Sequence, residues 1–126
     1  MKVVLDASAL LAFLQDEPGS GAVEDVLAEA CISAVNWSEV IQKSMAAEVD
    51  VTGLRADLEA LGLEVHDFTP EHAEAVGNLW PQTRRYGLSL GDRACMCLGM
   101  ALKLPVMTTD KAWKKVNLPV QVHVIR

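Results

Sequence analysis

Short apolar runs alternate with stretches of helical periodicity along this sequence, and this alternation limits the fold more than any other feature. At least one stretch of helical spacing separates each apolar run from the next. Because a helix that connects two strands of one sheet makes them parallel, this order predicts an α/β fold with a mostly parallel sheet and helices on both of its faces. The expected strands are residues 2–5, 31–33, 63–68, 105–108 and 120–125.

The helical stretches begin and end at capping and breaking residues. Thr69 is placed to cap a helix whose first residue is Pro70, and Pro81 marks a point at which that helix can break. No internal repeat or Gly/Ser-rich linker divides the sequence, so we expect a single domain over residues 1–126. The expected helices are residues 7–15, 21–30, 35–49, 52–61, 70–86, 89–104 and 111–116.

Charge is distributed unevenly along the chain. The formal net charge is −6 overall, but residues 1–80 carry a net charge of −12 and residues 81–126 a net charge of +6. Taken alone, the net acidity argues against nucleic-acid binding, because domains of that kind usually carry a basic excess. The split instead indicates a basic, partner-facing surface in the C-terminal part of the chain.

The cysteines and the apolar stretches indicate the compartment. Cys31, Cys95 and Cys97 lack the spacing of a disulfide framework and are expected to be buried thiols in a reducing cytosol. Asp6 interrupts the N-terminal apolar run, and no small-residue cleavage site follows it. The apolar stretch 94–102 is far shorter than the roughly 20 residues of a membrane span. We therefore expect a cytoplasmic protein without a membrane segment.

Four carboxylates stand at positions where a parallel sheet would bring them together. Asp6 and Asp110 each directly follow an expected strand, whereas Glu39 and Asp92 lie in the first turns of expected helices. Four anions in one pocket need compensation, and Mg²⁺ or Mn²⁺ is the cation that suits a set of oxygen ligands. The alternative is structural: Asp6 and Asp110 as helix caps, Asp92 as a capping-box partner, and Glu39 as a solvated helix residue.

The sequence around these acids resembles the PIN-domain ribonucleases, and among them the VapC-type toxins of bacterial toxin–antitoxin pairs. The resemblance extends over essentially the whole chain. It implies a PIN-like three-layer α/β/α domain with a mostly parallel central sheet. The matching segments are Val3–Ala9, Val35–Val40, Leu88–Ala94 and Thr108–Trp113.

The resemblance also implies roles for individual residues. Asp6 and Asp92 are the expected direct metal ligands, for Mg²⁺ or else Mn²⁺, while Ser8 and Thr109 would support the acids with their hydroxyl groups. It further implies a homodimer and a cognate antitoxin that covers the active site. The expected catalytic residues are Asp6, Glu39, Asp92 and Asp110.

The expected activity is therefore metal-dependent endoribonuclease cleavage by the toxin of a type II pair, leaving a 5′-phosphate and a 3′-hydroxyl. Basic residues must attract RNA to an acidic pocket, and Arg93 and Lys111 are nearest in sequence to the acids. One departure from the family pattern concerns residues 111–115, where many PIN domains carry a further acid and this chain has none. This departure weakens the case for a second permanent metal ion.

Three other functions compete with this interpretation. A haloacid-dehalogenase-type phosphatase also has an aspartate after its first strand, but it needs a second acid where this chain has Ser8. A receiver-like phospho-acceptor could use Asp6, Thr109 and Lys111, but it needs paired acids after the first strand. A catalytically silent PIN-like module that only binds a partner protein is the third alternative.

Overall fold

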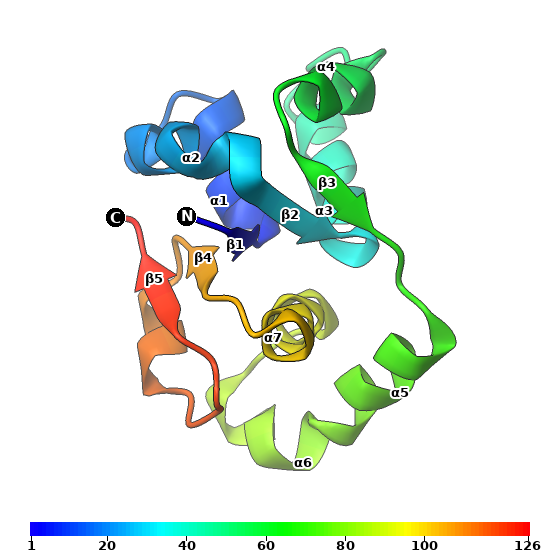
Figure 1. Cartoon of the computed structure of the whole chain (residues 1–126), viewed down its shortest axis with the longest axis vertical. Helices are drawn as coiled ribbons and strands as arrows, with labels where there is room; N and C mark the ends of the chain where they lie inside the picture. The colour runs from blue at the N-terminus through cyan, green and yellow to red at the C-terminus, as the bar shows by residue number, and fades with distance from the viewer.

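A five-stranded sheet forms the centre of the computed structural model, which describes residues 1–126 (Figure 1). The strand order is β3-β2-β1-β4-β5, and every neighbouring pair is parallel. The predicted α/β fold is therefore confirmed, with a sheet that is parallel throughout. The strands are β1 (Val3–Leu5), β2 (Ala30–Ser33), β3 (Glu64–His66), β4 (Val106–Thr108) and β5 (Val122–Val124).

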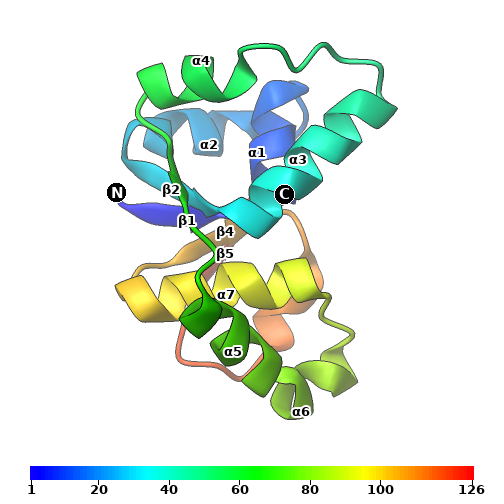
Figure 2. The same ribbon diagram turned by 90° about the vertical axis from the view of Figure 1, so that its right-hand side faces the viewer.

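Helices cover both faces of the sheet. Figure 2 shows α1 to α4 above the strands and α5 to α7 below them, which is the expected three-layer α/β/α arrangement. None of these helices has the length and apolar character needed to cross a membrane. The α-helices are α1 (Ala7–Leu14), α2 (Ser20–Val26), α3 (Ala34–Ala46), α4 (Leu54–Ala60), α5 (Pro70–Asn78), α6 (Trp80–Thr83) and α7 (Leu90–Leu102). The 3₁₀ helices are η1 (Leu27–Glu29), η2 (Arg84–Tyr86) and η3 (Lys111–Lys115).

Three expected helices differ from the observed elements. The stretch 21–30 consists of α2 and η1, and its last residue, Ala30, begins β2. The stretch 70–86 consists of α5, α6 and η2, and the first break falls at Leu79 rather than at Pro81. Pro81 lies in the first turn of α6, where an amide N–H has no helical acceptor and proline is tolerated. The stretch 111–116 forms the 3₁₀ helix η3 in place of an α-helix.

The central strand β1 is buried on both sides. Val3 and Leu5 pack in the larger core with α1 and α2, while Val4 packs on the other face in a core that contains Met96 and Trp113. All three β1 residues have no exposed surface. A polar side chain can therefore enter this part of the molecule only where the strand ends, which is the position of Asp6.

The chain changes direction across the sheet between β1 and β4. From β1 the chain proceeds through β2 to β3 on one side, and β4 and β5 lie on the other side. In open parallel sheets, ligands bind outside the carboxyl ends of the strands at such a switch point. The fold thus directs attention to the residues that follow β1 and β4.

Candidate active site

Asp6 is the innermost carboxylate at this edge of the sheet. It is the N-cap of α1, and its Oδ1 accepts a hydrogen bond of 2.8 Å from the backbone N–H of Ala9. Ser8 Oγ donates to the same oxygen over 2.8 Å, and Thr108 Oγ1 donates to Oδ2 over 2.6 Å. The side chain is only 6% exposed and forms no ion pair. Asp6 is thus a buried carboxylate that is fixed in orientation but lacks a cation.

The electrostatic consequence is a shift of the pKa of Asp6. Burial raises this pKa from its ordinary value of 3.8 to about 6. The hydrogen bonds from Thr108, Ala9 and Ser8 oppose the shift, and the nearby negative charge of Asp92 adds to it. A positive ion at this place would remove both unfavourable contributions.

Glu39 and Asp92 lie with Asp6 around one small cavity of about 60 Å³, between α1, α3 and the start of α7. Asn36 positions Glu39: its Nδ2 donates to Glu39 Oε1 over 2.8 Å and to the carbonyl oxygen of Gly91 over 2.9 Å. A Cβ atom at Gly91 would collide with the Glu39 carboxyl group, so the missing side chain leaves space for this acid. The expected convergence therefore holds for Asp6, Glu39 and Asp92.

Asp110 lies beside this cavity without lining it. Its exposed side chain caps η3 by accepting a hydrogen bond of 2.9 Å from the N–H of Ala112. Its own N–H donates to Thr108 Oγ1 over 3.1 Å, and the same hydroxyl group contacts Asp6. The hydroxyl group of Thr108 therefore connects Asp110 to Asp6 through hydrogen bonds, although the two carboxylates do not line the same cavity.

The structural alternatives hold for three of the four acids. Asp6 and Asp110 cap α1 and η3, and Asp92 forms a complete capping box with Ser89, with hydrogen bonds of 3.0 and 3.1 Å. The cap occupies only one carboxylate oxygen of Asp92 and of Asp110, and the other has no hydrogen-bond partner in the protein. Capping is therefore compatible with a second role for these oxygens. Glu39 is partly buried in the cavity and is not the solvated residue that the alternative requires.

The arrangement suits a divalent cation of the magnesium type. All the available donors are oxygens, and one of the carboxylates is buried without a counter-ion. No group of three or more His, Cys, Asp or Glu side chains is placed to hold a metal ion by itself. Mg²⁺ commonly binds through one or two carboxylates and completes its shell with water and substrate phosphate. Asp6 and Asp92 fit such a partial set of ligands.

The hydroxyl support for Asp6 comes from Ser8, as expected, and from Thr108 in place of Thr109. Thr108 is the last residue of β4 and is fully buried, so its side chain points into the site. Thr109 lies beyond the strand end and contributes its backbone N–H, which donates to Ser8 Oγ over 3.0 Å. The Thr109 hydroxyl group was expected to support the acids and forms no hydrogen bond with them. The strand β4 ends at Thr108, as predicted, and Thr108 lies beside Asp6 because β4 pairs with β1 in the register Leu5 with Met107.

The basic residues expected to bind RNA differ in their availability. Arg93 is partly committed, because its Nη1 donates to the carbonyl oxygen of Val76 over 3.0 Å and thereby joins α7 to α5. Lys111 is exposed and forms no ion pair.

The sequence analysis did not identify Asn36 and Lys43, both of which line the acidic cavity. Their spacing from Glu39, three residues before and four after, places them on the same helix face and was the available signal.

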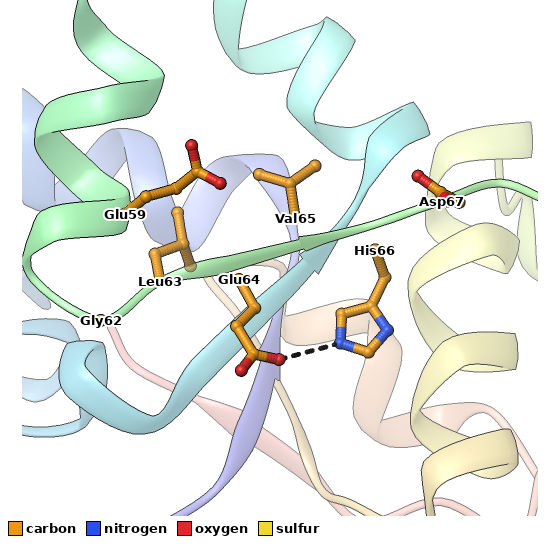
Figure 3. Close-up of a pocket in the computed structure, with 7 residues that line it drawn as sticks. All are labelled: Glu59, Gly62, Leu63, Glu64, Val65, His66 and Asp67. Atoms are coloured by element: carbon orange, nitrogen blue, oxygen red, sulfur yellow. Dashed lines mark ion pairs between the residues drawn. The ribbon is translucent and has the colours of Figure 1, made fainter.

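The largest surface hollow lies elsewhere. A cavity of about 710 Å³ lies along the edge strand β3 and contains Glu59, Glu64 and Asp67 (Figure 3). His66 Nε2 lies 3.4 Å from Glu64 Oε2, a contact drawn as a dashed line in Figure 3. This hollow contains no basic residue other than the histidine, so it does not favour a polyanion.

The fold and the site together define a class of protein. It is a three-layer α/β/α protein whose candidate active site consists of acidic residues at the carboxyl edge of a parallel sheet. Comparison with protein families places the chain within that class, because residues 3–118 match the PIN domain. The chain belongs to the PIN domain family. The family predicted from the sequence is thereby confirmed.

Solved structures share this fold. A toxin–antitoxin complex from Klebsiella pneumoniae matches with a TM-score of 0.73 and 17% identity, over 98% of each chain. VapBC2 from Rickettsia felis, bound to a DNA fragment from its promoter, matches with a TM-score of 0.69 and 16% identity over 98% of each chain. VapBC-1 from nontypeable Haemophilus influenzae matches with a TM-score of 0.69 and 17% identity, over 98% of this chain and 97% of the other. No curated protein sequence matches the chain.

Proposed function

We propose that this protein is a metal-dependent endoribonuclease and the toxin of a type II toxin–antitoxin pair. The observation that carries the proposal is the buried carboxylate of Asp6, which faces Glu39 and Asp92 at the switch point of the sheet without a cation of its own. Membership of the PIN domain family supports the nuclease activity. Solved toxin–antitoxin structures with the same fold support an antitoxin partner.

The metal ion in this proposal is Mg²⁺ or Mn²⁺, held by Asp6 and Asp92, with Glu39 and Asp110 completing the acidic quartet. When bound, such an ion neutralises charge on the scissile phosphate and makes the attacking water more acidic. Burial of Asp6 disfavours its charged form, so the carboxylate gains more from a cation than an exposed one would.

Four further side chains orient the metal ligand, accept a proton or contact the substrate in this proposal. Thr108 and Ser8 hold both oxygens of Asp6, which fixes the orientation of this carboxylate before the ion arrives. Glu39, held through its Oε1 by Asn36, keeps Oε2 free to accept a proton from the attacking water. The ammonium group of Lys43 offers a positive charge at the rim of the cavity for a phosphate oxygen. The products are a 5′-phosphate and a 3′-hydroxyl.

Polyanion binding needs positive charge near these acids. Five basic residues between positions 84 and 115 form no ion pair with a carboxylate and are therefore free to contact phosphates. They are Arg84, Arg85, Lys111, Lys114 and Lys115. RNA is the substrate in this proposal, and the protein acts in the cytoplasm as a homodimer that its antitoxin inhibits.

The test is incubation of the purified protein with total cellular RNA in Mg²⁺, in Mn²⁺ and in EDTA. We expect cleavage only with metal, and its loss in Asp92→Asn. Asp25→Asn is the matched control, because it removes an exposed carboxylate of α2 that has no partner. Mapped 5′-phosphate ends would support the mechanism, and 2′,3′-cyclic phosphate ends would contradict it, since they require attack by the RNA itself.

The same experiment distinguishes a nuclease from a catalytically silent module that only binds a partner protein. Equal RNA integrity with the wild type and Asp92→Asn, at every metal concentration, would favour that module over a nuclease. A phosphatase of the haloacid-dehalogenase type is disfavoured by Ser8, whose hydroxyl group donates to Asp6 where that chemistry needs a second acid.

A further inference from the structure

A second cavity, of about 470 Å³, lies between the α6–η2 segment and the loop that precedes β5. Figure 1 shows this loop reaching the segment that leads from α6 to α7. The volume falls within the range of roughly 300–1,000 Å³ that is typical of ligand pockets. The residues that line it and enter the argument are Pro81, Gln82, Arg85, Tyr86, Asn117 and Pro119.

The chemistry of this cavity is the opposite of that at the β3 edge. Its lining contains no acidic residue and includes one guanidinium group, that of Arg85. Arg85 lies 4.8 Å from the ring centroid of Tyr86, donates over 2.7 Å to the Tyr86 hydroxyl group, and pairs with no carboxylate. The cavity therefore offers an aromatic ring with an adjacent, uncompensated positive charge.

The remaining lining residues suit a heterocyclic base. Gln82 and Asn117 each carry an amide group that can both donate and accept hydrogen bonds, as the edge of an unpaired base requires. Pro81 and Pro119 supply rigid apolar contacts. Trp80, which precedes the lining residue Pro81 in the chain, is 51% exposed and has Arg84 5.4 Å above its ring, so a second aromatic and basic pair is present in the same segment.

Both walls of the cavity are close in sequence to a residue of the acidic site. Tyr86 precedes Asp92 by only six residues, a separation of at most about 22 Å even for an extended chain. The other wall begins at Asn117, which follows Asp110 through the η3 helix and its two terminal lysines. A single RNA strand that spans at most about 22 Å can therefore contact both Asp92 and this cavity.

We propose that this cavity binds an unpaired nucleotide of the substrate RNA, with its base against Tyr86 and its phosphate at Arg85. The proposal rests on the proposed ribonuclease function and adds a recognition subsite outside the cleavage centre. Base stacking on an aromatic side chain combined with a nearby cation is how proteins hold single-stranded nucleic acid. Because this subsite contacts a base edge through Gln82 and Asn117, it contributes to the choice of RNA sequence.

The test is binding of a short, fluorescein-labelled, single-stranded RNA of mixed sequence, followed by fluorescence anisotropy in EDTA so that no cleavage occurs. We expect Tyr86→Ala to weaken binding roughly 5- to 150-fold and Tyr86→Phe to restore it. Arg85→Gln should lower the slope of log K against log salt concentration by about 0.7, the value for one lost phosphate contact. Arg55→Gln is the matched control, because Arg55 is an exposed arginine of α4 that pairs with Glu59.

Folding of each variant is checked by circular dichroism. If Tyr86→Ala does not fold, Gln82→Glu replaces it, because it puts a negative charge into the cavity at an exposed position and should also weaken binding. Binding within twofold of the wild type for the folded Tyr86 or Gln82 variant and for Arg85→Gln would overturn the subsite. So would a loss of self-association in these variants, by sedimentation, with RNA binding unchanged.

Failure of the subsite is distinguishable from failure of the nuclease proposal. If the wild type cleaves RNA with metal but the cavity variants bind RNA normally, only the subsite is wrong. If the wild type binds RNA through this cavity but never cleaves it, the subsite is supported and the nuclease proposal is wrong.

Discussion

Replacing Asp6 by asparagine should abolish activity and yet remove a destabilising charge from the metal-free protein near neutral pH. Burial raises the pKa of this carboxyl group from 3.8 to about 6, which means that the folded protein disfavours the ionised form. At pH 7.5 this difference in pKa corresponds to a destabilisation of about 3 kcal/mol. Asparagine carries no charge and removes this cost.

The difference in stability between the wild type and Asp6→Asn should depend on pH in a predictable direction. Because the folded-state pKa lies above the unfolded-state pKa, the destabilisation is fully present above pH of about 6 and disappears as the pH falls towards about 4. Roughly half of the 3 kcal/mol is already gone at pH 5. Asparagine also disturbs the hydrogen bonds from Thr108 and Ser8, at a cost of about 1–3 kcal/mol that does not depend on pH. The change with pH is therefore a cleaner measure than the absolute difference.

The assay is urea denaturation of the wild type and Asp6→Asn in EDTA at pH 5 and pH 7.5. We expect the free energy of unfolding of the variant, relative to the wild type, to increase by about 1.5 kcal/mol between these pH values. Mg²⁺ should then stabilise the wild type at pH 7.5 and not the variant. If the free-energy difference between the variant and the wild type is the same at both pH values, or changes in the opposite direction, Asp6 is not a destabilising buried anion.

Other substitutions separate the roles of neighbouring residues. Thr108→Val should lower the free energy of unfolding by about 1–3 kcal/mol and reduce RNA cleavage, because it removes the hydroxyl group shared by Asp6 and Asp110, whereas Thr109→Val should change neither in the same urea and cleavage assays. Gly91→Ala should reduce cleavage by up to about 100-fold by displacing Glu39, while a thermal melt stays near that of the wild type because alanine is the better helix former. Lys43→Met should weaken RNA binding with a smaller salt dependence, and an unchanged salt slope would argue against a phosphate contact.

The sequence determined the class of fold and most of the candidate site. Apolar runs separated by helical spacing are sufficient for a parallel α/β sheet, because the covalent connection through a helix forces the strands to be parallel. The same pattern located Asp6 and Asp110 at strand ends, since a strand buried on both faces leaves polar residues only at its termini. The boundaries of the elements were predicted less accurately: the stretch 70–86, predicted as one helix that can break at Pro81, consists of three elements and breaks first at Leu79.

The tertiary structure alone decided which of these side chains meet. Which hydroxyl group reaches Asp6 depends on how β4 pairs with β1, and this register brings Thr108 rather than Thr109 into contact with the carboxylate. Asn36 acquires its role only because α3 and α7 pack together, which brings Glu39 and Gly91 within reach of one amide group. The cavity near Tyr86 likewise joins segments about thirty residues apart in the chain.

Local sequence therefore determined which residues could carry charge at the carboxyl edge of the sheet, because burial and strand length act over a few neighbouring residues. It did not determine that Asp6, Glu39 and Asp92 share a cavity while Asp110 stands beside it. Distances between side chains from different elements depend on the strand order β3-β2-β1-β4-β5 and on helix packing across the sheet. Those are properties of the assembled core, to which every element contributes.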